Sequence, residues 1–108
     1  MARREVRRSN LFLEHAHELF PPGGSAEGSP SFELFESGPL RGVEELFSRA
    51  LDDQPEAAPG IHFALLAPVP AFPAMVIYAC LGTDGVVELL DIEIDHDYYD
   101  LIGDDPTE

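Results

Sequence analysis

Acidic residues with regular spacing near the C-terminal end carry the clearest potential for chemistry. Asp91, Glu93 and Asp95 alternate with apolar residues, so an extended strand places them on one face at intervals of about 7 Å. That interval is close to the distance of about 7 Å between successive phosphates along one DNA strand. Three interpretations stay open: a stripe that binds a basic partner or mimics DNA, a face that is solvated or neutralised by N-terminal arginines, and a site for a hard cation.

The residues after this row add aromatic and titratable groups. His96, Asp97, Tyr98 and Tyr99 follow Asp95 directly, in a segment that we expect to be an acidic tail. Tyrosine side chains contribute large contact areas at protein interfaces. The expected partner-binding residues are therefore Asp91, Glu93, Asp95, Asp97, Tyr98 and Tyr99. A second hypothesis is an enzyme in which His96 transfers protons together with Tyr98 or Tyr99, but we assign no residue a catalytic role.

Two other groups of side chains have a structural and a chemical interpretation. Glu14, His17 and Glu18 have the spacing to share one helix face and could hold a metal ion, although a solvated polar face has the same pattern. His15 would point to the other side of that helix. The one cysteine, Cys80, excludes an internal disulfide and a cysteine zinc site, and its apolar strand predicts a buried, unreactive thiol. We expect no metal and no cofactor.

The charge of the chain restricts its partners. The net charge is −15 over 108 residues, and 13 of the 21 acidic residues, but none of the six basic ones, follow Arg49. Such a surface repels nucleic acid and anionic membranes and attracts basic proteins, although strong acidity also serves solubility alone. No apolar run approaches the roughly 18 residues that cross a bilayer. No long apolar run follows the basic N-terminus, so we expect a cytoplasmic protein without a secretory signal.

The basic residues cluster at the N-terminus, where Arg3, Arg4, Arg7 and Arg8 lie close together. As an arm for nucleic acid they would attract phosphates locally, while the rest of the molecule would repel them. We therefore expect these arginines to form ion pairs within the molecule or with a partner.

Hydrophobic spacing predicts helices in the first half of the chain. Residues 3–8 have the pattern of a short extended segment, after which Ser9 or Asn10 can cap a helix. Residues 21–30 are rich in Gly, Pro and Ser and predict a flexible loop. Ser31 can cap a short helical turn, and the apolar residues of 39–52 recur at helical spacing.

The period changes to that of strands in the second half. Residues 61–67 form an apolar strand, and the prolines of residues 68–73 favour an edge or a connecting loop. Residues 74–81 are apolar on both faces, as in a central strand, and a loop containing Asp-Gly leads to the strand of residues 86–95. We expect one α+β domain over residues 1–108. Its N-terminal strand and two helical regions would pack on one face of a three- to four-stranded, mainly antiparallel sheet, and residues 103–108 would form an acidic tail.

This order of elements resembles the RelE/ParE superfamily of small bacterial toxins. The matching segments are residues 5–9, which run into a helix, residues 51–55, which end one, and residues 72–78 and 86–92, which look like the last two strands. The resemblance implies a first strand, a helical pair and a three-stranded antiparallel sheet. It also implies an antitoxin-like protein as one candidate partner.

The catalytic residues of that superfamily are missing here. Its ribosome-dependent members resemble acid–base ribonucleases with Lys and Arg on the sheet, whereas this chain has neither after Arg49. A ribonuclease must hold a polyanion and stabilise extra negative charge in the transition state. His62, His96, Tyr98 and Tyr99 could transfer protons, but no cation accompanies them. We therefore expect a non-enzymatic module that binds a basic protein and no nucleic acid, with a ribonuclease and a DNA-mimic inhibitor as alternatives.

Overall fold

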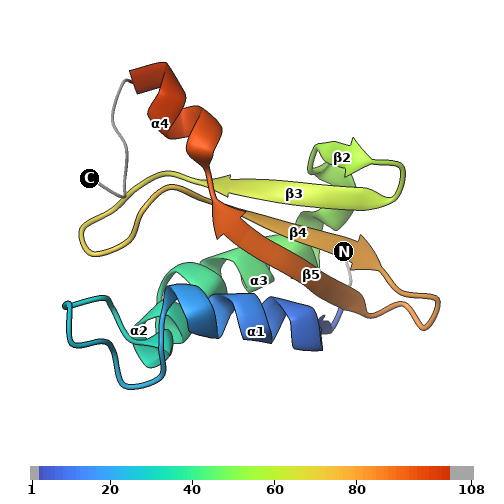
Figure 1. The fold of residues 1–108 in the computed structure, drawn as a ribbon. Helices are drawn as coiled ribbons and strands as arrows, with labels where there is room; N and C mark the ends of the chain where they lie inside the picture. Colours follow the sequence, from blue (N-terminus) through green and yellow to red (C-terminus); the bar gives the residue numbers. More distant parts are fainter. Residues whose placement is uncertain (1–2, 103–108) are drawn as a thin grey trace.

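A five-stranded sheet with the order β1-β5-β4-β3-β2 organises residues 3–102, the part of the chain that the computed structural model describes (Figure 1). Strand β1 runs parallel to β5, and the other neighbours are antiparallel. The strands are β1 (Val6–Arg8), β2 (Glu56–Ala58), β3 (Ile61–Leu66), β4 (Met75–Leu81) and β5 (Val87–Ile94). The expected α+β class is confirmed, and the apolar strand β4 is central as predicted.

The strand count differs from the three to four that the sequence predicts. The additional strand is β2, which folds back on the start of β3 so that Glu56 pairs with His62 and Ala58 with Ile61. All three residues of β2 are exposed. A short exposed strand buries nothing, so it leaves no hydrophobic alternation by which the sequence could reveal it.

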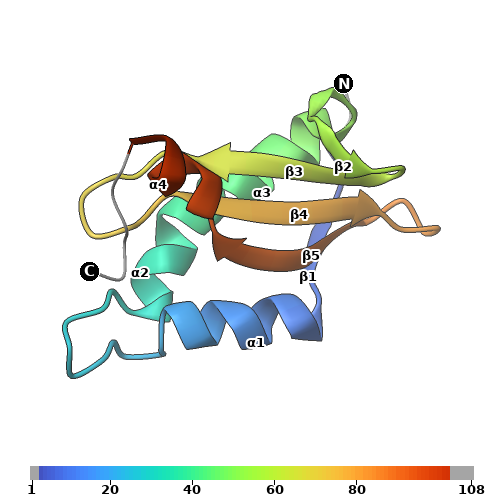
Figure 2. The same cartoon turned by 45° about the horizontal axis from the view of Figure 1, so that its top comes forward.

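Three helices cover one face of the sheet, and a fourth lies on the other side (Figures 1 and 2). The covering helices are α1 (Asn10–Leu19), α2 (Phe32–Ser37) and α3 (Pro39–Ala50), and α3 continues into a 3₁₀ turn, η1 (Leu51–Asp53). The fourth helix, α4 (His96–Ile102), replaces the start of the expected acidic tail. The predicted tail at residues 103–108 lies outside the described residues. None of the helices in residues 3–102 is both long and apolar enough to cross a membrane.

Local sequence signals set the helix ends. The Ser9 hydroxyl accepts a hydrogen bond from the Phe12 N–H at 3.0 Å, and the Ser31 hydroxyl accepts one from the Leu34 N–H at 3.2 Å. Each bond satisfies an amide that has no partner within its own helix. Helix α3 begins at Pro39, whose missing N–H is no loss at a first helical position.

The core lies between the sheet and the three covering helices. Phe12, Phe35 and Phe47 are completely buried, and Phe35 stacks on Phe20 with ring centroids 4.8 Å apart. The sheet contributes residues of β4 and β5 that point toward the helices: Met75, Ile77, Ala79, Val87, Leu89 and Ile92.

A β-bulge interrupts the pairing of β4 with β5. Tyr78 pairs with Asp91 and Ala79 with Leu89, which leaves Leu90 as the additional residue. A bulge puts two residues opposite one and changes which face the following residues occupy. It therefore lets both Leu89 and Ile92 face the core, and it places Asp91 and Glu93 on the uncovered face.

Candidate functional site

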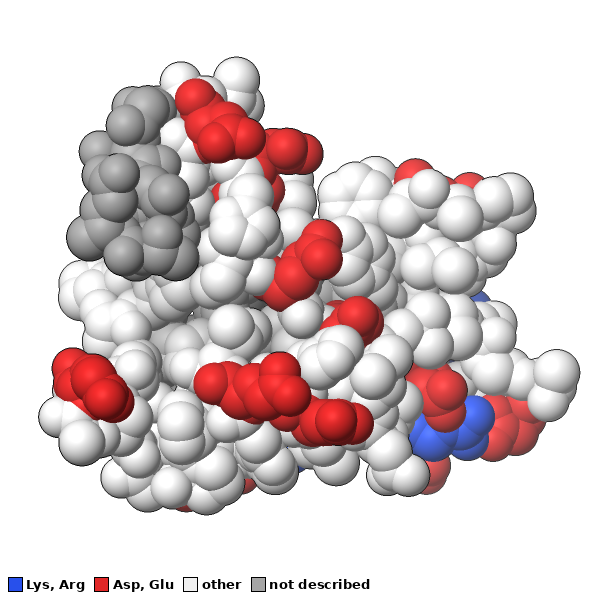
Figure 3. Space-filling model, viewed as in Figure 1, with Lys and Arg blue, Asp and Glu red and all other residues white. Residues whose placement is uncertain are grey.

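The face of the sheet opposite α1, α2 and α3 carries a hollow with an apolar floor and an acidic rim. Phe63 and Leu65 of β3 and Val76 and Tyr78 of β4 form the floor. Asp95 and Asp97, where β5 leads into α4, close one end, and the hollow has a volume of about 220 Å³. In Figure 3 the acidic side chains of this face form separate groups among uncharged ones. The lining includes no Lys or Arg.

Glu93 lies on this face and turns inward across the sheet. Its carboxylate accepts a 2.6 Å hydrogen bond from the Tyr78 hydroxyl, one strand away. This bond, followed by burial and by the charges of Glu93, Asp91 and Asp95, raises the pKa of Tyr78 to about 12. The neighbouring carboxylates contribute to this rise because the ionised phenol would add a further anion to this face.

Asp91 turns in the opposite direction, over the outer edge of β5. Its Oδ1 accepts the N–H of Ile92 at 2.8 Å and lies 2.5 Å from Nδ1 of His15 on α1. The hydrogen bond to Asp91 raises the pKa of His15 above its ordinary value. Asp91 therefore attaches the first covering helix to the sheet, and its charge is engaged inside the molecule.

Asp95 and Asp97 lie at the start of α4. The Asp95 carboxylate caps this helix by accepting the Tyr98 N–H at 3.2 Å. Asp97 is exposed. The Tyr99 hydroxyl accepts the N–H of Ala74 at 2.9 Å and so fixes α4 to the start of β4, while the rings of Tyr98 and Tyr99 meet edge to face at 5.2 Å.

The predicted row of carboxylates is thus divided among three different contacts. Asp91 binds His15, Glu93 binds Tyr78, and Asp95 caps α4. The structure brings Asp95, Asp97 and the Glu93–Tyr78 pair around one hollow and turns Asp91 away from it. The sequence reasoning missed the floor of this hollow. Its one signal was the apolar alternation of Ile61, Phe63 and Leu65, which face the uncovered side of β3.

His62 and His96, two histidines of the enzyme hypothesis, lie in different parts of the fold. His62 lies on β3, where its Nδ1 is 2.9 Å from the Gln54 carbonyl oxygen. His96 borders a second hollow, of about 330 Å³, between α1 and β5, together with His15, Glu18, Asp91 and Glu93. Neither hollow is lined by a Lys or Arg that could stabilise a phosphorane-like transition state.

The four N-terminal arginines pair with acidic residues within the molecule, as expected. Arg7 binds Glu88 at 2.8 Å and also Asp84. Arg8 binds Glu44 at 3.0 Å and also Glu36. These bonds raise the pKa of both arginines. Arg3 and Arg4 bind Glu45 and Asp52. None of these partners is Asp91, Glu93 or Asp95, so the possible neutralisation of that row by the N-terminal arginines is wrong.

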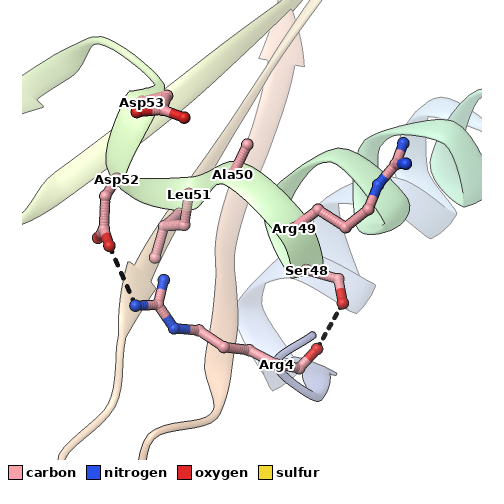
Figure 4. Close-up of a pocket in the computed structure, with 7 residues that line it drawn as sticks. All are labelled: Arg4, Ser48, Arg49, Ala50, Leu51, Asp52 and Asp53. Atoms are coloured by element: carbon pink, nitrogen blue, oxygen red, sulfur yellow. Dashed lines mark hydrogen bonds and ion pairs between the residues drawn. The ribbon is translucent and has the colours of Figure 1, made fainter. Parts of the chain in front are cut away.

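A pocket of about 320 Å³ beside η1 is closed by one of these pairs (Figure 4). The Arg4 guanidinium points to Asp52, 3.0 Å away, and the Arg4 carbonyl accepts the Ser48 hydroxyl at 2.6 Å. Arg4 is therefore paired within the molecule, and the second arginine of the lining, Arg49, lies 3.6 Å from Glu45, so we assign no ligand to this pocket.

Metal-binding and thiol chemistry find little support in the geometry. Within residues 3–102, no three His, Cys, Asp or Glu side chains are arranged to hold a metal ion. His17, of the possible Glu14–His17–Glu18 set, packs against the Phe32 ring at 4.4 Å. Cys80 is only half-buried, contrary to expectation, because it lies on the uncovered face opposite Glu88. Burial and Glu88 raise the pKa of its thiol, which disfavours the reactive thiolate.

No protein-family model, curated protein or solved structure matches this chain.

Proposed function

We propose that this protein is a non-enzymatic interaction module that binds a basic partner protein on the uncovered face of its sheet. The observation that carries the proposal is the combination of an apolar floor, formed by Phe63, Leu65 and Val76, with the carboxylates of Asp95 and Asp97 at its end. Apolar contact supplies affinity, and charges around its rim supply orientation and a faster encounter.

The carboxylates of the rim keep free capacity for such a partner. A carboxylate has two oxygens with about four lone-pair positions, and Glu93 and Asp95 each use one oxygen for the contacts described above. A Lys or Arg of the partner could therefore bind without displacing Tyr78 or the cap of α4. The fitting partner is an amphipathic segment with apolar side chains toward the floor and basic ones toward Glu93, Asp95 and Asp97.

The resemblance to RelE/ParE toxins adds a candidate class of partner, a basic antitoxin-like segment. A DNA-mimic inhibitor is an alternative, and the division of the carboxylates among three directions argues against it, because a mimic needs them in one continuous row. The toxin-like ribonuclease is disfavoured because neither acidic hollow is lined by a Lys or Arg.

The test uses the Glu93→Gln/Asp97→Asn double variant and a control with the same change in charge, Glu14→Gln/Glu27→Gln, at two exposed positions away from the hollow. The probe is a synthetic peptide of alternating Lys and Leu, with a peptide of alternating Glu and Leu as its counterpart. We expect only the basic peptide to shift amide resonances of β3, β4 and β5, with an affinity that falls as salt rises.

The double variant should lose most of this affinity, and the control should keep it. Partners captured from the host at low and at high salt should show the same dependence, and competition by duplex DNA would favour the mimic. Equal binding of the two peptides, or equal affinity of the double variant and its control, would refute the proposal.

A further inference from the structure

An uncharged surface around the edge of β3 contrasts with the rest of this acidic molecule. Residues 57–83 contain no Asp, Glu, Lys or Arg, although the whole chain has a net charge of −15. Within this segment Leu65 and Val69 are 63% and 52% exposed. In Figure 3 the region of β2 and β3, at the upper right, is correspondingly white over most of its area.

The outer edge of β3 is paired over only part of its length. On the side away from β4, β2 pairs with Ile61 and His62, and the Phe63 N–H donates to the Pro55 carbonyl at 3.0 Å. Along a strand, every second residue directs its N–H to the same side, so the Leu65 N–H points outward as that of Phe63 does. Among the described residues, no strand pairs with β3 on that side beyond Phe63.

From Ala64 to Ala67, before Pro68, this edge carries no charge, no proline and, among the described residues, no covering strand. Natural edge strands are protected by charged residues, by proline, by bulges or by a covering segment. The opposite side of the sheet is protected in these ways. There β1 pairs with β5. The Ser9 N–H donates to the Leu89 carbonyl and the Ser9 hydroxyl to the Leu90 carbonyl, and the Asp91 carboxylate accepts the Ile92 N–H. Residues 61–67 carry no charge and no proline.

An apolar pocket of about 350 Å³ lies beside the same edge, on the helix side of the sheet. Leu66 and Ala67 at the end of β3 line it together with uncharged residues of α3, β4 and the connecting loop, which are Pro39, Val69, Pro70, Phe72 and Met75. A strand added at this edge would therefore meet apolar side chains as well as backbone groups.

We propose that a second copy of this chain pairs with the free edge of β3, so that two sheets join into one through a two-fold axis. An antiparallel edge is complementary to itself under a two-fold rotation. Residues 61–73 bring no carboxylate of their own to this contact between two molecules of charge −15, although Leu65 also lines the hollow that Asp95 and Asp97 border. A basic partner would be drawn to those carboxylates, whereas a second copy would use the backbone edge beside them.

The position of Pro55 limits the register. Because Pro55 already lies opposite Phe63, the added strand must begin beyond that residue. The pairing that satisfies this condition and stays nearest to β3 places the two Leu66 residues opposite each other at the axis and Leu65 of each copy opposite Ala67 of the other. In antiparallel geometry Leu65 and Ala67 then exchange backbone hydrogen bonds across the interface, and the two Leu66 residues form the non-hydrogen-bonded pair.

Sedimentation of the protein without any partner tests this proposal. The wild type should sediment as a species of twice 11.8 kDa, in a concentration-dependent equilibrium. Leu65→Lys should sediment as a monomer, because it puts a charge on the joined edge. Leu34→Lys is the matched control, since Leu34 is 59% exposed on α2, and it should remain a dimer. Higher salt should strengthen the dimer by screening the repulsion between copies, whereas it weakens the binding of a basic partner.

A cysteine at the axis tests the register even if Leu65→Lys fails to fold. In a Cys80→Ser background, Leu66→Cys should form a disulfide between two copies under mild oxidation. Directly opposite residues of a non-hydrogen-bonded pair have Cα atoms about 4.5 Å apart, which is within the range for a disulfide. A wild type that stays monomeric at millimolar concentration, or a Leu66→Cys variant that forms no cross-link, overturns the proposal. Either result leaves the basic-partner proposal intact, because no partner is present in these experiments.

Discussion

The ionisation of Tyr78 measures the electrostatic character of the proposed binding face. Its hydroxyl donates to Glu93 at 2.6 Å, and the hydrogen bond, burial and the neighbouring carboxylates raise its pKa from 10.0 to about 12. At pH 11 an ordinary tyrosine is about nine-tenths ionised, whereas one with a pKa of about 12 is about one-tenth ionised. The two cases therefore differ by a large and easily measured fraction.

We expect Glu93→Gln to bring the Tyr78 pKa most of the way back toward 10.0, because Glu93 supplies both the largest contribution to the shift and a further one through its charge. Glu14→Gln, which removes the same charge from the exposed face of α1, should leave the Tyr78 pKa almost unchanged. NMR of ¹³C-labelled tyrosine rings follows Tyr78 separately from Tyr98 and Tyr99, and circular dichroism confirms that the chain stays folded at each pH.

The outcome also bears on partner binding. A Tyr78 pKa near 10 in the folded wild type would refute the hydrogen bond to Glu93, and an unchanged high value in Glu93→Gln would show that Glu93 does not cause the rise. In either case Glu93 would not hold the position beside Tyr78 from which we propose that it faces a basic partner.

Two further predictions concern the contacts that hold the site in place. His15 has a raised pKa in the folded state because of its bond to Asp91. The stabilisation from this pair should therefore be complete below pH 6.5 and should fade as the pH rises through the folded-state pKa. Asp91→Asn should lower the His15 pKa in an NMR titration and remove this pH dependence from the free energy of urea unfolding. Phe35 is completely buried and stacks on Phe20, so Phe35→Ala should lower the free energy of unfolding by about 3–5 kcal/mol. Leu34 is exposed on the same helix, so Leu34→Ala should change this free energy by less than about 0.5 kcal/mol. Similar losses for both variants would mean that α2 does not pack as described.

The parts of the fold that local chemistry controls could be predicted from the sequence. Ser9 and Ser31 are good N-caps in any context, and both cap helices here. The apolar pattern of β4 required burial on both faces, and β4 is the middle strand of the five. These signals were sufficient because each depends on a few neighbouring residues and on whether a surface is buried.

The parts that the sequence did not reveal depend on contacts between distant segments. The role of Asp95 as a helix cap was hidden because the same residue completes the alternation of the preceding strand, so α4 was interpreted as a tail. The bulge at Leu90 depends on how β5 meets β4. The partner of Asp91, His15, lies 76 positions away in the chain, and no local pattern connects the two.

The distribution of ion pairs explains why the acidic excess acts at one end of the sheet. Arg7 and Arg8 on β1 are held beside the start of β5, because β1 pairs with Val87, Glu88 and Leu89 only. From there they neutralise Asp84 and Glu88 of the hairpin and Glu36 and Glu44 of the helices. Beyond Leu89 the parallel pairing with β1 ends, so β1 places no arginine beside the later residues of β5. The same short strand that brings arginines to the first half of β5 thus brings none to its second half, where His15 pairs with Asp91, or to Asp95 and Asp97 after it. The lack of an arginine beside Glu93, Asp95 and Asp97 is what the proposed basic partner would complement.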